Sequence, residues 1–197
     1  MALTDKEHQD AAERAAASVG RRLSRRVERP RSDEMKKDWS TFTRRITANS
    51  TTRAIYNAWT IPDQIEKWFL SKARFTTRLR EERPTSERAA AGDKYAWEWH
   101  GYADGSPESG TVLAANGHDF FSFTFADESI VEVLIRSEDG EKIVELTQKN
   151  ISPDENLHIF IGCGEGWTFY LANLKSFLEG GIDLRNKNDK IKSVINS

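Results

Sequence analysis

The sequence predicts an α+β domain in which an antiparallel sheet packs against a long helix at the end of the chain. Between residues 94 and 148, apolar and polar residues alternate in short runs that are separated by tight turns. Turns of this length leave no room for a crossover, so neighbouring strands must be antiparallel. From Trp167 to Leu178, apolar residues recur every three or four positions, which is typical of a helix that buries one face. The sheet is the large apolar partner available to that helix.

The first part of the domain is predicted to form a strand, two short helices, a second strand and a charged loop. These elements are expected over residues 39–46, 51–59, 62–69, 73–79 and 80–92. Asn49 and Ser50 offer an N-cap for the first helix. Pro62 is expected to open the second helix, because its missing N–H costs nothing at the first helical position.

The middle of the domain is predicted to be a meander of strands that leads into the last helix. The strands are expected over residues 94–102, 111–115, 119–126, 130–136 and 142–148. Asn116-Gly117 and Asp139-Gly140 are strong hairpin signals. The glycines at 162, 164 and 166 leave two interpretations open for the segment before Trp167. They allow either a close approach of helix to sheet or a loop at the mouth of a cavity.

The two ends of the chain differ from the domain that we expect over residues 39–184. Residues 1–38 contain no aromatic side chain and carry ten Lys and Arg against eight Asp and Glu. So polar a segment cannot bury enough apolar area to fold alone, and we predict a solvated, partly helical extension. The alternative is that its arginines, which cluster over 21–31, contact phosphates. Residues 185–197 are predicted to form a flexible polar tail.

Composition excludes several classes of protein. The single cysteine, Cys163, cannot form an internal disulfide or a cysteine-based metal cluster, and it is expected to be a small buried side chain. A formal charge of -2 gives no bias toward nucleic acid, and no stretch is apolar enough to span a membrane. The four histidines are far apart. We therefore expect no metal, no cofactor, no nucleic-acid partner and a cytoplasmic location.

Two motifs resemble the START-like or SRPBCC superfamily, whose members have the helix-grip fold. They are RAIYNAWTIPDQIEKWF at 53–69 and GWTFYLANLKSFLEG at 166–180. The start of a strand at Gly92-Asp93-Lys94-Tyr95 fits as well. Within the superfamily, the chain is most similar to the branch named after the activator of the ninety-kilodalton heat-shock protein ATPase (Aha-type). The resemblance covers roughly 40–184 and implies a curved sheet of six or seven strands wrapped around the C-terminal helix, with a cavity between them.

Aromatic and leucine side chains are the candidate site residues, because they would face one another across the gap between sheet and helix. They are Trp59, Trp68, Phe69, Tyr95, Trp97, Trp99, Phe121, Phe123, Phe125, Trp167, Tyr170, Leu171 and Leu174. Ligand pockets are mostly apolar with a few polar groups, so these residues predict a ligand cavity. The alternative is a solid aromatic core with no ligand. Glu132, Glu145, Gln148 and Glu165 are candidate polar anchors.

Three functions follow as expectations. The resemblance first implies a non-enzymatic domain that binds a hydrophobic or amphipathic small molecule between sheet and helix. The second is a module that interacts with a chaperone, as in the eponymous branch. The third is a cyclase-like or hydrolase-like enzyme, which would require a carboxylate with a raised pKa in the cavity. No catalytic residue is assigned from the sequence.

Overall fold

The computed structural model describes residues 38–101, 107–152, 156–188 and 190–191. The extension predicted for 1–38 lies almost entirely outside these residues, as does much of the tail predicted from 185. The elements, in order, are β1 (Phe42–Ala48), α2 (Thr52–Thr60), α3 (Pro62–Trp68), β2 (Lys72–Thr76), β3 (Lys94–Glu98), β4 (Glu108–Ala115), β5 (Phe120–Phe125), β6 (Ser129–Glu138), β7 (Glu141–Lys149) and α4 (Asn156–Leu178).

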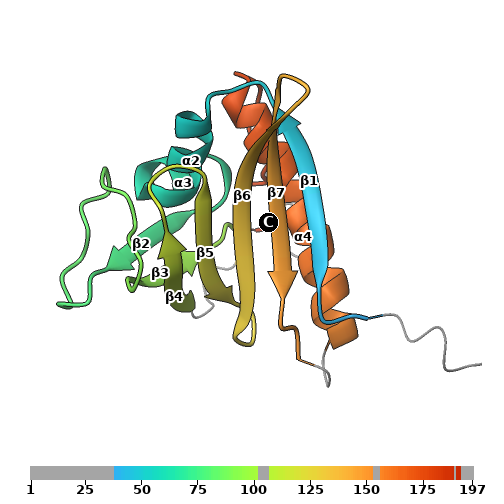
Figure 1. Ribbon diagram of the computed structural model, residues 1–197. Helices are drawn as coiled ribbons and strands as arrows, with labels where there is room; N and C mark the ends of the chain where they lie inside the picture. The colour runs from blue at the N-terminus through green and yellow to red at the C-terminus, as the bar shows by residue number, and fades with distance from the viewer. Residues whose placement is uncertain (1–37, 102–106, 153–155, 189, 192–197) are drawn as a thin grey trace, which may run out of the picture. The chain divides into compact units, whose positions relative to one another are not determined.

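The strands form one antiparallel sheet of seven in the order β1-β7-β6-β5-β4-β3-β2 (Figure 1). From β2 to β7 each strand lies beside its neighbours in the chain, as the short turns predict. β1 is the exception, because it joins the far edge by pairing with β7, from Phe42 opposite Gln148 to Ala48 opposite Lys142. The predicted α+β helix-grip fold is confirmed.

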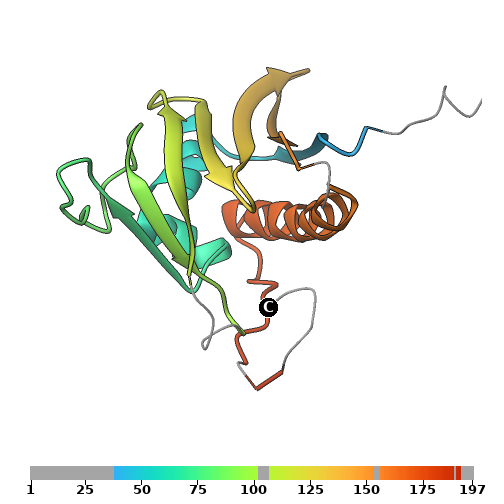
Figure 2. The same ribbon diagram turned by 90° about the horizontal axis from the view of Figure 1, so that it is seen from below.

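The sheet bends around α4, which lies on its concave side, as Figure 2 shows from below. Residues at alternate positions of the strands face α4 and are buried, among them Phe123 on β5, Val133 on β6 and Leu146 on β7. From the helix, Leu171 and Leu174 belong to the same buried core. The apolar stripe of the helix and the alternation of the strands therefore meet in one layer.

The two short helices close one end of this layer. Thr51 caps α2, with its Oγ1 accepting a hydrogen bond from the Ala54 N–H at 3.1 Å, so the N-cap lies just beyond the predicted Asn49 and Ser50. Pro62 opens α3 as predicted. Trp68 joins the two helices, because its buried Nε1 donates to the Ala58 carbonyl at 2.8 Å.

Helix α4 begins eleven residues before Trp167, at Asn156, and runs without a break through all three glycines. The interpretation of Gly162, Gly164 and Gly166 as a loop at a cavity mouth is therefore wrong. Gly164 permits a close approach instead: a Cβ there would lie 2.8 Å from an amino group of the Arg44 guanidinium on β1.

The C-terminal end of α4 is held by buried polar groups. Asn173 donates from Nδ2 to the Trp68 carbonyl at 2.5 Å, and its Oδ1 accepts from the Leu184 N–H at 2.8 Å. Arg185 is the first residue of the predicted tail, yet its guanidinium is buried and donates to the Leu70 carbonyl at 2.8 Å. The packed part of the chain therefore includes Arg185.

Candidate ligand-binding site

The predicted site residues come together in the core between sheet and α4. Eleven of them are buried, and Trp99 and Phe125 are partly buried against the same cluster. Phe69, which directly follows α3, lies at the centre of the aromatic group. Its ring centroid is 5.6 Å from that of Trp97, 5.4 Å from that of Trp167 and 4.8 Å from that of Tyr170. Such separations are typical of interacting aromatic pairs.

Two indole N–H groups inside this cluster have no hydrogen-bond partner among the described residues. They belong to Trp59 and Trp97, whose side chains are 2% and 1% exposed. Both rings contact Phe69, at centroid distances of 6.2 and 5.6 Å. A buried donor without an acceptor is unfavourable by about 1–3 kcal/mol, and native proteins contain few of them. The aromatic cluster therefore contains two unsatisfied hydrogen-bond donors among its apolar side chains.

A chain of buried hydrogen bonds crosses the concave face beside these rings. Gln148 on β7 is fully buried, and its Oε1 accepts from Trp167 Nε1 at 2.9 Å. The Gln148 amide nitrogen donates to Ser129 Oγ at 2.8 Å, and that hydroxyl donates to the Phe125 carbonyl. Because every group in this chain is paired, it fixes the orientation of Trp167 rather than offering a free polar contact.

Cys163 on α4 is partly buried and packs against the core cluster beside Gln148. Burial raises the pKa of its thiol, an effect that the hydrogen bond with Gln148 opposes and the charge of Glu108 adds to. Burial likewise raises the pKa of the Tyr95 hydroxyl, with a further contribution from Glu108. The thiol is therefore protonated at neutral pH, which does not favour a nucleophile, and the side chain is partly buried where a fully buried one was expected.

Of the four candidate polar anchors, Gln148 alone is in the interior. Glu132 pairs with Lys149 at 2.6 Å, and Glu145 pairs with Arg45 and Arg136 at 3.3 and 3.2 Å. These ion pairs lie on the outer face, because both glutamates occupy the positions between buried residues of their strands. Glu165 is exposed on α4.

Sequence reasoning missed Glu108, the carboxylate that acts electrostatically on both Tyr95 and Cys163. Its position opposite Trp97 in the β3–β4 register puts it on the face of the sheet that carries the aromatic rings. The sequence holds one signal for this, since Glu108 is two residues from Gly110 and four from Val112 on one strand face. The strand predicted over 111–115 begins three residues after the observed start of β4 at Glu108, so it does not include this carboxylate.

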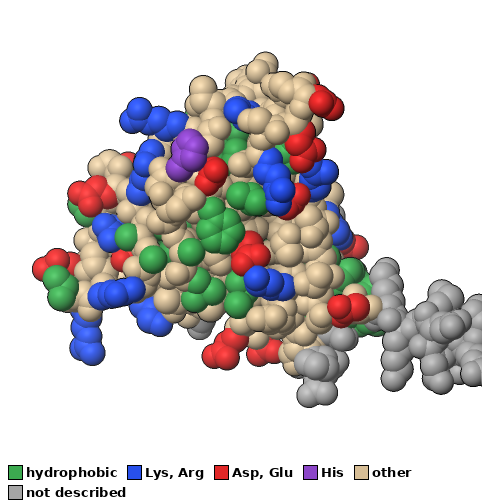
Figure 3. Space-filling model, viewed as in Figure 1, with side chains coloured by type: hydrophobic (Ala, Val, Ile, Leu, Met, Phe, Trp, Pro, Cys, Tyr) green, Lys and Arg blue, Asp and Glu red, His purple; other side chains and the backbone are tan. Residues whose placement is uncertain are grey.

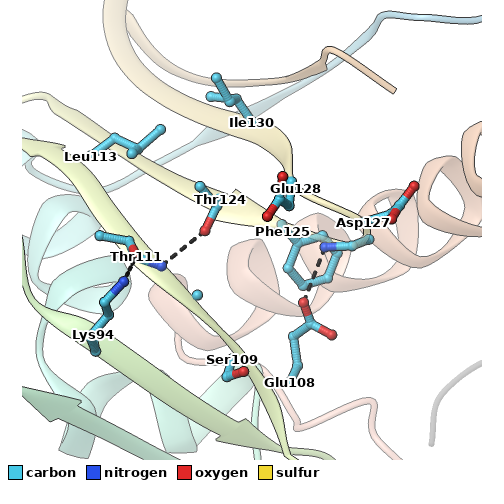
Figure 4. A pocket seen from close by; sticks show the side chains of 12 residues that line it. Lys94, Glu108, Ser109, Thr111, Leu113, Thr124, Phe125, Asp127, Glu128 and Ile130 are labelled. Atoms are coloured by element: carbon cyan, nitrogen blue, oxygen red, sulfur yellow. Dashed lines mark hydrogen bonds between the residues drawn. The ribbon is translucent and has the colours of Figure 1, made fainter. Parts of the chain in front are cut away.

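A hollow of about 620 Å³ lies over the junction of β4 and β5 (Figure 4). In Figure 3 hydrophobic side chains gather over this part of the outer face, with charged side chains around them. The lining residues come from β3 to β6 and are Lys94, Glu108, Ser109, Gly110, Thr111, Leu113, Thr124, Phe125, Ala126, Asp127, Glu128 and Ile130. Phe125 is the one predicted site residue among them.

The curved sheet around a long C-terminal helix, with aromatic rings between them, defines a helix-grip domain. Residues 49–179 match the family described as Activator of Hsp90 ATPase homolog 1-like protein, and the chain belongs to that family. A search among curated proteins gave no match.

Solved structures from several bacteria share the fold. Protein SSP2350 from Staphylococcus saprophyticus is similar with a TM-score of 0.59 and 15% identity, over 79% of this chain and 98% of that one. The Aha1 dimer from Colwellia psychrerythraea gives 0.56 and 17%, over 72% and 97%. CalU16 from Micromonospora echinospora gives 0.54 and 18%, over 73% and 77%. Among the described residues, no helix is both long and apolar enough to cross a membrane.

Proposed function

We propose that this domain binds a largely apolar small molecule between the sheet and α4, in contact with the aromatic cluster. The ligand is uncharged where it is buried and carries hydrogen-bond acceptors, such as carbonyl or ether oxygens. The proposal rests above all on the unpaired indole N–H groups of Trp59 and Trp97. Family membership supports it at the level of a START-like binding domain.

Acceptor chemistry follows from what the two indoles can do. An indole nitrogen donates one hydrogen bond and accepts none, so it pairs with a lone pair and not with an amine or a hydroxyl hydrogen. The surrounding side chains are rings and aliphatic groups, in which an ionised group would be strongly destabilised. A flat molecule with carbonyl or ether oxygens would satisfy both donors and stack on the rings.

The test uses prodan, a neutral naphthalene that carries a carbonyl group, and naphthalen-1-amine, which lacks the carbonyl. We expect prodan to bind at one molecule per chain with a blue shift of its emission. Replacing Trp97 by Phe removes the N–H while keeping a ring, and should weaken prodan about tenfold but leave naphthalen-1-amine unchanged. Native mass spectrometry of the protein from its own host would identify the natural ligand.

Trp68→Phe is the matched control, since the Trp68 indole already donates to the Ala58 carbonyl at 2.8 Å. This variant should lose stability but keep its affinity for prodan at temperatures where it is folded. If Trp97→Phe and wild type bind prodan with equal affinity, the Trp97 indole does not donate a hydrogen bond to the ligand, and that part of the proposal is refuted. Absence of any binding by the folded wild-type protein would reject the small-molecule function.

A second function, interaction with a chaperone of the Hsp90 type, is favoured by one surface feature besides the family. Leu157 and Ile161 lie one turn apart on α4 and are each 48% exposed, so they form an apolar pair on the surface. We expect the double replacement by Asp to abolish binding to a purified Hsp90-type chaperone while leaving prodan binding intact. If the double variant still binds both the chaperone and prodan, Leu157 and Ile161 are not the contact with the chaperone.

A further inference from the structure

The outer hollow lies where the pairing of β4 and β5 stops. The two strands are paired from Ala115 opposite Phe121 to Val112 opposite Phe123, with a register shift between Val112 and Ala114. The first four residues of β4, 108–111, are paired with β3 and not with β5. The sheet therefore has a split between the start of β4 and the end of β5.

Side chains close this split in place of ladder bonds (Figure 4). The Thr111 N–H donates to Thr124 Oγ1 at 2.9 Å, and the Ala126 N–H donates to Glu108 Oε1 at 3.1 Å. The Tyr95 hydroxyl donates to the Thr124 carbonyl at 2.5 Å. A rotamer change of Thr124 or Glu108 can break the bonds that these two side chains accept without moving a whole strand, which is not true of a backbone ladder.

Phe125 connects the two sides of the split. Its ring is partly buried, it lines the outer hollow, and its centroid is 5.2 Å from that of Trp167 and 6.3 Å from that of Trp99. On β4, Gly110 has no side chain, and a Cβ there would lie 2.6 Å from both Thr124 Oγ1 and the Tyr95 hydroxyl. The Phe125 ring therefore contacts both the hollow and the aromatic cluster.

The turn after Phe125 holds its end of the split under strain. Ala126, Asp127 and Glu128 have φ of 38°, 57° and 62°, so three successive residues other than glycine are in the left-handed region. This region is unfavourable for each of them. The end of the split therefore lies beside a locally strained turn.

We infer that the split between β4 and β5 is a route by which a small molecule passes between the outer hollow and the aromatic interior, with the Phe125 ring as its gate. The inference rests on the proposed function, because it concerns how the same ligand reaches its site. It adds that the side-chain bonds across the split control the rate of exchange and not the affinity. The hollow is large enough to receive a molecule of the size of prodan before it enters.

Stopped-flow binding of prodan to a cross-linked protein tests the route. Thr111→Cys and Thr124→Cys, in a Cys163→Ala background, place two thiols on facing positions of the split. When this disulfide forms, association and dissociation of prodan should both slow at least about tenfold, with the dissociation constant within about twofold of that of the reduced protein. Reduction should restore both rates.

The matched control places the disulfide where β4 and β5 are already paired, with Ala114→Cys and Ser122→Cys in the same background. It should leave both rates unchanged. A second variant, Phe125→Leu, tests the gate without a cross-link and should accelerate both rates several-fold.

The outcomes separate the route from the function. If prodan binds wild type, but the oxidised Thr111/Thr124 pair and Phe125→Leu both exchange it at the wild-type rate, the route is refuted and the function stands. If prodan does not bind the folded wild-type protein at all, the proposed function fails and the route fails with it. Slowing by both disulfides alike would also overturn the inference, because a general stiffening of the sheet would then explain the effect.

Discussion

Replacing Asn173 by Ala should strongly destabilise the domain, although the residue is not part of the aromatic cluster. The side chain is fully buried and joins α4 to two other segments, the end of α3 through the Trp68 carbonyl and the C-terminal segment through the Leu184 N–H. Alanine leaves the buried Trp68 carbonyl without this donor, at a cost of about 1–3 kcal/mol. The Leu184 N–H lies nearer to solvent, and its lost bond adds about 0.5–1.5 kcal/mol.

The sum predicts that Asn173→Ala lowers the free energy of unfolding by about 2–4 kcal/mol. Urea denaturation followed by tryptophan fluorescence measures this difference, with an unchanged m-value as the sign that both states are otherwise the same. Asn188→Ala is the control, because that side chain is exposed and forms only local bonds, and it should change the value by less than about 0.5 kcal/mol. A loss below about 1 kcal/mol for Asn173→Ala would show that the three segments are not held by this amide.

Three further predictions concern the core, the acid limit of stability and the thiol. Leu174→Ala should lower the free energy of unfolding by about 2–5 kcal/mol, measured by urea denaturation, because the side chain is fully buried in the core. Burial alone would raise the pKa of Asp183, but hydrogen bonds from Arg185 and Lys187 outweigh it and hold that pKa well below its ordinary value. A carboxyl group whose pKa is lowered by folding stabilises the fold at pH values above its unfolded-state pKa, and this stabilisation is lost as the pH falls. The stability difference between wild type and Asp183→Asn should therefore shrink as the pH falls from about 5 to about 2. Cys163 is partly buried and the pKa of its thiol is raised, so at neutral pH it should react with a thiol reagent more slowly than free cysteine, and reaction of the native protein as fast as free cysteine would contradict this.

The order of elements and the interior set of side chains were predictable from the sequence, because both follow from short-range patterns. Turn length forces the antiparallel neighbours from β3 to β7, and period-two alternation places Trp97 and Phe123 on one face. The pairing of β1 with β7 joins residues 94 to 106 positions apart, from Ala48–Lys142 to Phe42–Gln148, and no local pattern encodes such a contact.

The finer features of the site depend on geometry that alternation does not contain. Which indole nitrogen finds an acceptor is decided by ring orientation, so Trp68 and Trp167 are paired while Trp59 and Trp97 are not. The start of α4 was hidden by its glycines, which lower intrinsic helix propensity. Here the contact of α4 with β1 outweighs that propensity.

The pairing of β1 with β7 also has a consequence for how the chain folds as it is made. Among the strands of the described residues β1 is made first, and its partner Glu141–Lys149 follows nearly a hundred residues later. At about 5–20 residues per second, β1 waits several seconds without a partner. Its edge would meanwhile be open to other chains, a hazard that charged residues reduce, and Arg44 and Arg45 lie in the middle of this strand. Closure of the sheet by β1 should therefore be a late event in folding, and slow for a domain of this size, because long-range pairing must overcome the entropy of a large loop.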